Sequence, residues 1–230
     1  MFFVWNALKL AVDAPRWWRG RTPHTGKIFC IGCNKTGTTS IGVALESLGY
    51  RLGDQQTAER FVDDWARRDF NRLVEYCDSA DAFQDVPFSL ADTYKTLDRA
   101  FPGSKFVLTV RDSADQWFES MTRFHTKLLA KGRLPTADDL REFQYNEPGW
   151  MWKAHQLIFL PDADEALLYN RPHYKRQYEA HNRAVKAYFR WRPADLLVLN
   201  LRRHEAMDSL CRFLGFERGE RVMPHLNKSA

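Results

Sequence analysis

Short apolar runs alternate along the chain with segments whose apolar residues recur at helical spacing. The run KIFCIG at residues 27–32 ends in a glycine, and a helical pattern follows at 40–49. KFVLTV at 105–110 is apolar and β-branched on both faces, as a central strand of a parallel sheet requires. DLLVLNL at 195–201 and DAFQDVP at 81–87 indicate two further strands. The pattern therefore predicts four strands separated by helices.

Further helices are predicted from the same spacing, at residues 57–76, 89–101, 113–129, 171–191 and 204–215. The segment 57–76 is predicted to form one long helix that carries Phe61, Trp65 and Leu73 on a single face. Strands and helices that alternate with short connections are typical of α/β proteins. We therefore predict a three-layer α/β sandwich around a central parallel sheet.

The chain has 230 residues, which is long enough to bury the core of one large domain. We predict a single domain at 27–230 with an insertion or lid around 131–160, where prolines and aromatic residues interrupt the pattern. Residues 1–26 are predicted to form an N-terminal amphipathic extension, whose apolar face falls short of the roughly 20 residues that cross a bilayer. Residues 1–21 can lie on a membrane surface or pack on the domain, and both alternatives stay open.

Composition narrows the class of partner. The 34 lysine and arginine residues exceed the 29 acids and give a net charge of +5, which favours anionic partners. No basic block is long enough to indicate a nucleic-acid tail, so no nucleic-acid partner is expected. The four cysteines are too few and too scattered for a disulfide scaffold, and we expect a cytoplasmic location. Cys30 and Cys33 form a CxxC pair, but no second pair completes a zinc site, so we expect no metal.

The segment IGCNKTGTTS at 31–40 has the composition of an anion-binding loop. Gly32 and Gly37 keep the glycine spacing of the nucleotide loop GxxxxGK[ST], but the lysine stands at Lys35, inside the turn. Backbone N–H groups of such a turn and of a helix that begins near Thr38 favour an oxyanion, and Lys35 adds a positive charge. The hydroxyl donors of the segment are Thr36, Thr38, Thr39 and Ser40.

Two other predicted strands end in charged residues. Arg111 follows the strand at 105–110, where a nucleoside triphosphatase would place a metal-binding acid. Asp85 lies at the end of the strand at 81–87. Ligands of open α/β sheets bind at the carboxyl ends of strands, so we expect Lys35, Asp85 and Arg111 to share one site. Protein cations, rather than magnesium, are expected to neutralise the ligand.

These motifs carry a family resemblance. CNKTGTTSI at 33–41 is similar to the 5′-phosphosulfate loop of sulfotransferases, and KFVLTVRDSADQWFES at 105–120 resembles their 3′-phosphate motif. YEAHNRAVKAYF, DLLVLNL, CRFLGF and MPHLN resemble the C-terminal half of a bacterial-type and invertebrate sulfotransferase group. The resemblance runs from about residue 27 to 228. It implies a P-loop nucleotide-hydrolase-like fold and an enzyme that transfers a sulfuryl group from 3′-phosphoadenosine 5′-phosphosulfate to a hydroxyl or amine of a small-molecule or carbohydrate acceptor.

The resemblance also implies roles for individual residues. Lys35 would contact the bridging oxygen of the phosphosulfate, Arg111 and Ser120 the 3′-phosphate, and Asp85 would replace the usual histidine base. The 5′-phosphate would be held by Thr36, Gly37, Thr38 and Thr39, with Ser40 completing the loop. The chain departs from the family pattern at Ser113, which replaces a proline, and at Ser120, which lies one residue later than usual. On a helix that offset is a rotation of about 100°.

Alternatives remain at the level of the sequence. Asp85 can equally cap a helix or pair with an arginine, and His125 is the reserve base. His181 is expected to be structural. The aromatic residues of 143–159 fit an acceptor pocket or the core of the insertion.

Two other functions compete with sulfuryl transfer. One is a P-loop kinase-like enzyme that depends on Mg²⁺, and the other is a nucleotide-binding module without transfer. The residues leave the acceptor and the oligomeric state open.

Overall fold

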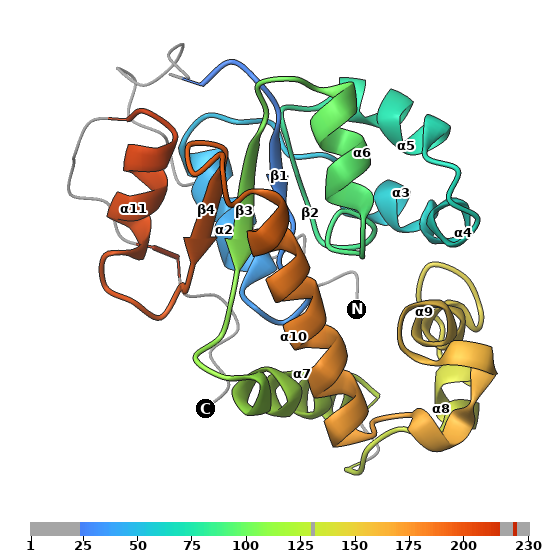
Figure 1. The fold of residues 1–230 in the computed structure, drawn as a ribbon. Coiled ribbons are helices and arrows are strands. Elements are labelled where there is room, and N and C mark those ends of the chain that lie inside the picture. Colours follow the sequence, from blue (N-terminus) through green and yellow to red (C-terminus); the bar gives the residue numbers. More distant parts are fainter. Residues whose placement is uncertain (1–23, 130–131, 217–222, 225–230) are drawn as a thin grey trace.

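A computed structural model describes residues 24–129, 132–216 and 223–224. Within this part of the chain, four parallel strands form one sheet in the order β2-β1-β3-β4 (Figure 1). The strands are β1 (Ile28–Cys30), β2 (Ala82–Gln84), β3 (Lys105–Thr109) and β4 (Leu196–Leu199). All four predicted strands are confirmed.

Helices cover both faces of the sheet and extend beyond its carboxyl end (Figure 1). The α-helices are α2 (Thr38–Ser47), α3 (Gln55–Glu59), α4 (Val62–Ala66), α5 (Asn71–Tyr76), α6 (Thr93–Ala100), α7 (Ala114–Leu128), α8 (Ala137–Glu142), α9 (Trp150–Phe159), α10 (Arg171–Tyr188) and α11 (Ala206–Phe213). Short 3₁₀ turns are η2 (Cys77–Ser79), η3 (Pro161–Ala163) and η4 (Glu165–Leu167). None of the described helices is both long enough and apolar enough to cross a bilayer.

The two faces of the sheet pack into separate apolar clusters, because successive side chains of a strand point to opposite sides. On one face Ile28 and Cys30 of β1 pack with apolar residues of α2 and α11. On the other face Phe29 and Ile31 pack with residues of α6 and α10. Helices therefore form a layer on each side of the parallel sheet, which confirms the predicted three-layer α/β sandwich.

A third apolar cluster lies beyond the carboxyl end of the sheet. It joins α7, α8, α9 and the first half of α10, with Trp117, Leu140, Trp150 and Tyr174 buried at its centre. The predicted insertion at 131–160 supplies α8 and α9 to this cluster. Both helices lie beyond the carboxyl end of the sheet, and α9 contacts α4 (Figure 1).

The prediction of one long helix at 57–76 is wrong, because the segment forms three short helices, α3, α4 and α5. The chain turns after α4 at Arg68, which has a left-handed φ of 60°. Because the segment is broken in this way, its apolar residues pack in two different clusters. Phe61 and Leu73 join the cluster on the sheet face, whereas Trp65 packs in a separate small cluster and donates its indole N–H to the Ala91 carbonyl at 3.0 Å.

Residues 1–23 of the predicted N-terminal extension lie outside the described residues. The predicted membrane contact through residues 1–21 falls wholly in that part. The described chain begins at His24, whose ring nitrogen lies 3.4 Å from the Lys27 carbonyl just before β1.

A substitution of Gly32, in the loop after β1, tests how closely this loop packs against β3. A Cβ at this position would lie 2.4 Å from the Thr109 carbonyl oxygen and 2.6 Å from its backbone nitrogen. We expect Gly32→Ala to lower the free energy of unfolding by about 3 kcal/mol, since backbone atoms cannot rotate away. Urea denaturation measures this. Gly103→Ala is the control: its Cβ meets no atom within 4 Å, so only its left-handed φ should cost about 1 kcal/mol. An equal cost at both positions would contradict the steric explanation.

Candidate active site

The loop between β1 and α2 is braced against β3. The hydroxyl of Thr36 donates to the Cys33 carbonyl at 2.5 Å and lies 2.6 Å from the Thr109 hydroxyl. Lys35 and Gly37 both have left-handed backbone, with φ of 69° and 108°. These contacts turn Thr36 inward, where it is almost fully buried. Its hydroxyl therefore holds the loop in place instead of facing a ligand.

A cavity of about 1360 Å³ opens at the carboxyl end of the sheet. It is bounded by the loop after β1, the segment after β2, α7, α9 and α10. The sequence-predicted residues that line it are Lys35, Gly37, Thr38, Thr39, Ser40, Asp85, Arg111 and Ser120. Of the predicted site residues, Thr36 does not line the cavity. Ser120 reaches the cavity despite its offset in the motif.

Lys35 is a half-buried cation at the centre of the loop. Its Nζ lies 3.3 Å from the centroid of the Phe124 ring of α7. Burial lowers the pKa of Lys35 to about 8, Asp85 opposes that change, and the charge of Arg111 adds to it. The aromatic face is a favourable place for an ammonium group that has lost water. The charge is thus held inside the cavity at neutral pH.

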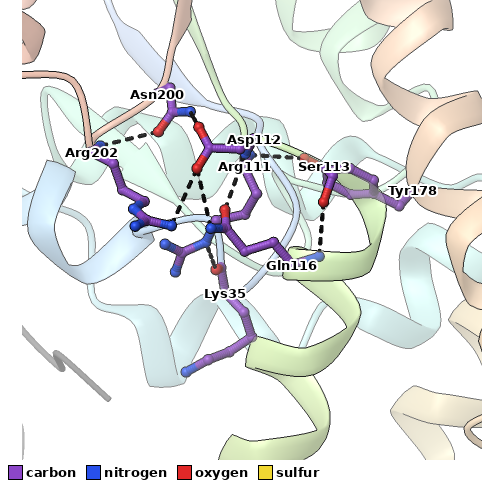
Figure 2. A network of polar contacts seen from close by, with 8 residues as sticks. All are labelled: Lys35, Arg111, Asp112, Ser113, Gln116, Tyr178, Asn200 and Arg202. Atoms are coloured by element: carbon purple, nitrogen blue, oxygen red, sulfur yellow. Dashed lines mark hydrogen bonds and ion pairs between the residues drawn. The ribbon is translucent and has the colours of Figure 1, made fainter. Parts of the chain in front are cut away.

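Arg111 links the end of β3 to the loop (Figure 2). Its Nε donates to the Lys35 carbonyl at 2.8 Å, and its backbone N–H donates to the Tyr178 hydroxyl at 3.0 Å. Burial lowers the pKa of Arg111, and the nearby charge of Arg202 does so as well. The guanidinium is therefore positioned by the same loop that carries Lys35.

The acid next to Arg111 is engaged by protein groups. Asp112 accepts hydrogen bonds from Asn200 at 2.7 Å and from Arg202 at 3.2 Å, and Gln116 donates to it as well (Figure 2). The backbone N–H of Arg202 in turn donates to the Asn200 side chain at 3.1 Å. Among the described residues, no group of three or more histidine, cysteine or acidic residues could hold a metal ion.

Asp85 leaves β2 towards the anion loop. Its carboxylate accepts from the Thr38 hydroxyl at 3.1 Å and from the Val86 N–H at 3.0 Å. Burial raises the pKa of Asp85, while these two bonds and the charge of Lys35 work in the opposite direction. Neither alternative role is seen in the described chain: the residue caps no helix and accepts from no arginine. A buried carboxyl group with a raised pKa therefore lies beside the loop.

The two histidines considered from the sequence occupy structural positions. His125 is buried with its Nδ1 2.9 Å from the Tyr169 hydroxyl, and burial lowers its pKa well below the usual value. Its ring lies 5.2 Å from that of His155, whose Nδ1 lies 3.1 Å from the Tyr174 hydroxyl. His181 contacts the carbonyl of Ile31 with Nε2 at 2.8 Å, in line with its expected structural role. His125 and His181 also line the cavity.

Sequence reasoning missed Glu59, which lines the same cavity from α3. Its carboxylate accepts from the Asn146 side chain at 2.6 Å and is nearly buried, and burial raises its pKa to about 7. Glu59 falls within the predicted long helix, where an acid is ordinarily solvent-exposed. It is the last residue of α3, just before the break that precedes α4, and no signal in the sequence marks that break.

A family model described as a sulfotransferase domain matches residues 27–230. That match spans all four strands and the cavity-lining elements. No curated protein matches the chain.

Phe124 should help to keep Lys35 charged. Removing the ring in Phe124→Leu should lower the pKa of Lys35 by about one pH unit, because a desolvated cation–π contact contributes roughly 1–2 kcal/mol. NMR of protein with ¹³C-labelled lysine, titrated with pH, measures the pKa, and Lys35→Gln identifies the signal. Phe124→Tyr keeps an aromatic face and is the matched control. An unchanged Lys35 pKa in Phe124→Leu would contradict the interpretation.

Proposed function

The chain belongs to the sulfotransferase family, and from that premise we propose that it transfers a sulfuryl group from 3′-phosphoadenosine 5′-phosphosulfate to a hydroxyl or amine. One observation carries the proposal: Lys35, Arg111 and Asp85 line one cavity at the carboxyl end of the sheet. Two cations suit a multiply charged donor, and a carboxylate of raised pKa suits an acceptor that must lose a proton.

The residues present fit this donor. The absence of a side chain at Gly32 lets the loop approach β3 closely, and the left-handed turns at Lys35 and Gly37 leave backbone N–H groups for an oxyanion. We assign the 5′-phosphate to this loop with Thr38 and Thr39, and the 3′-phosphate to Arg111 and Ser120. Ser40 lies in the first turn of α2 and also lines the cavity. Thr36 supports the loop from behind through Thr109. The donor itself supplies the phosphosulfate bond that is broken.

The chemistry of the transfer is assigned to two residues. Lys35 stabilises the negative charge that develops on the 5′-phosphate oxygen as its bond to sulfur breaks. Asp85 accepts the proton of the acceptor hydroxyl or amine as that atom forms its bond to sulfur. Arg111 contributes indirectly as well, since its bond to the Lys35 carbonyl fixes the turn that positions the ammonium. Protein cations offset the donor's charge, so the proposal requires no metal.

The organisation of the chain fits this assignment. We propose one domain at 27–230, in which α9 and the segment before it form a wall on the acceptor side of the cavity. None of the four cysteines, all of which lie in the described chain, forms a disulfide, which fits the proposed cytoplasmic location.

Nucleotide binding is the first test. Calorimetry with 3′-phosphoadenosine 5′-phosphate should detect binding by the wild type, and Arg111→Ala should weaken it at least about tenfold, because charge-assisted hydrogen bonds are lost. Lys35→Ala should also weaken it. Arg183→Ala is the control, since this arginine of α10 lies outside the cavity lining. No binding at millimolar nucleotide, or equal binding by all variants, would refute the donor assignment.

Transfer from ³⁵S-labelled donor to a panel of alcohols, phenols, amines and sugars tests Asp85. Asp85→Asn should lose about 10²-fold or more in rate while keeping its nucleotide affinity, because the amide accepts no proton. In the wild type, kcat/KM should rise with pH as Asp85 ionises and fall from about pH 8 as Lys35 loses its proton. Labelling that survives Asp85→Asn would exclude this base. Labelling of no acceptor, with intact nucleotide binding, would favour a binding module.

A further inference from the structure

The cavity is divided electrostatically. The cations that line it come from the anion loop, from the end of β3 and from α7: Lys35, Arg111, Arg123 and Lys127. Its acids come from α2, α3 and the segment after β2: Glu46, Glu59, Asp85 and Asp92. Because β2 and β3 lie on opposite sides of β1, the basic groups gather mainly towards β3 and the acids towards β2. The proposed donor occupies the basic half, which leaves the acidic half for the acceptor.

Glu59 is a buried acid of the acidic half without a cationic partner in the described chain. It is 6% exposed. Oε2 accepts from Asn146 at 2.6 Å, but Oε1 has only long contacts, with the Tyr145 hydroxyl and the Gln55 amide both at 3.4 Å. A buried carboxylate is costly unless it is paired and fully hydrogen-bonded. Oε1 therefore retains capacity for a strong donor.

Three other residues of the cavity lining, Gln84, Tyr94 and Trp150, each carry a buried polar atom without a hydrogen-bond partner in the described chain. The amide oxygen of Gln84 and the indole N–H of Trp150 have no hydrogen-bond partner among the described residues, and the two residues are 7% and 6% exposed. Both line the cavity, Gln84 from the end of β2 and Trp150 from α9. Met151 and Ile158 of the same helix as Trp150 add apolar side chains to the lining. The acidic half thus combines an apolar wall with unmet hydrogen-bonding groups.

We propose that this half binds an amphiphilic amino alcohol, whose ammonium group contacts Glu59 while its apolar body lies on Trp150 and Met151 and its hydroxyl faces Asp85. This inference rests on the proposed function and names its substrate class. A cation supplies the partner that Glu59 lacks. An acceptor that carries carboxylate or sulfate groups would instead place like charges beside Glu59 and Asp85, so acidic carbohydrates are disfavoured.

Proton release gives a specific signature of this contact. Burial raises the pKa of Glu59 to about 7, with the charge of Asp85 acting in the same direction. The groups that face it are Tyr145 and Asn146 of the insertion, Gln55 of its own helix, and Asp85. A bound ammonium would lower the pKa, so binding at pH 7 should release about half a proton.

The experiment compares three probes of similar shape and different charge: 4-phenylbutylamine, 4-phenyl-1-butanol and 4-phenylbutanoate. Calorimetry at pH 7 is run with and without saturating 3′-phosphoadenosine 5′-phosphate, in buffers of different ionisation enthalpy. The wild type should bind the amine at least about tenfold more tightly than the alcohol, and the carboxylate most weakly. Glu59→Gln should lose both the preference for the amine and the proton release. Glu179→Gln, an exposed acid of α10 outside the lining, should keep both.

The outcomes separate this inference from the proposed function. Nucleotide that binds, together with an amine that binds no better than the alcohol, overturns the inference alone. A preference for the amine that survives Glu59→Gln overturns the role of Glu59. Absence of nucleotide binding overturns the donor assignment, while the titrations without nucleotide still decide the preference for a cation. If Glu59→Gln does not fold, the order of the three probes and the proton release in the wild type decide it.

Discussion

The close contact between the loop after β1 and strand β3 is the constraint on which the site depends. Gly32 leaves no space for a side chain against Thr109, and the hydroxyl of Thr36 bonds to the hydroxyl of the same threonine. This contact fixes the height of the turn above the sheet. It thereby places the Lys35 carbonyl within 2.8 Å of the Nε of Arg111, which follows two residues after Thr109. The two predicted phosphate-binding elements thus form one hydrogen-bonded unit.

Buried charge is the second organising feature, and it is distributed unevenly. Two cations of the cavity contact aromatic or backbone groups of the protein: Lys35 contacts Phe124, and Arg111 donates to the Lys35 carbonyl. Glu59, by contrast, is buried with one oxygen weakly bonded. A site that binds an anion benefits from protein cations held in place before binding. A buried acid without a cation is costly in the empty protein, and a ligand of opposite charge relieves that cost.

Much of the fold follows from the sequence, because buried parallel strands and amphipathic helices have distinct periods. The strand at 105–110 and the helix after it appear as predicted. For the same reason the sequence placed Asp85 and Arg111 at strand ends, and both line the cavity. The segment 57–76 could not be read correctly, since its helical period continues through a turn set by tertiary contacts of Trp65. Glu59 was missed because it lies at the end of α3, at another break of the same segment. The inward rotation of Thr36 was missed because it depends on a contact with Thr109, far away in the sequence.

The position of the lysine within the loop now has a structural reason. In the left-handed conformation at Lys35, the backbone carbonyl faces Arg111 while the side chain extends to Phe124 of α7. A lysine directly after Gly37 would stand in the first turn of α2, where Thr38 instead bonds to Asp85. Moving the cation into the turn therefore frees that position for a hydroxyl that contacts the proposed base. The position of the lysine inside the turn therefore lets one loop carry both Lys35, assigned to the leaving oxygen, and Thr38, assigned to the donor phosphate. Thr38 in turn contacts Asp85, which is assigned to the proton.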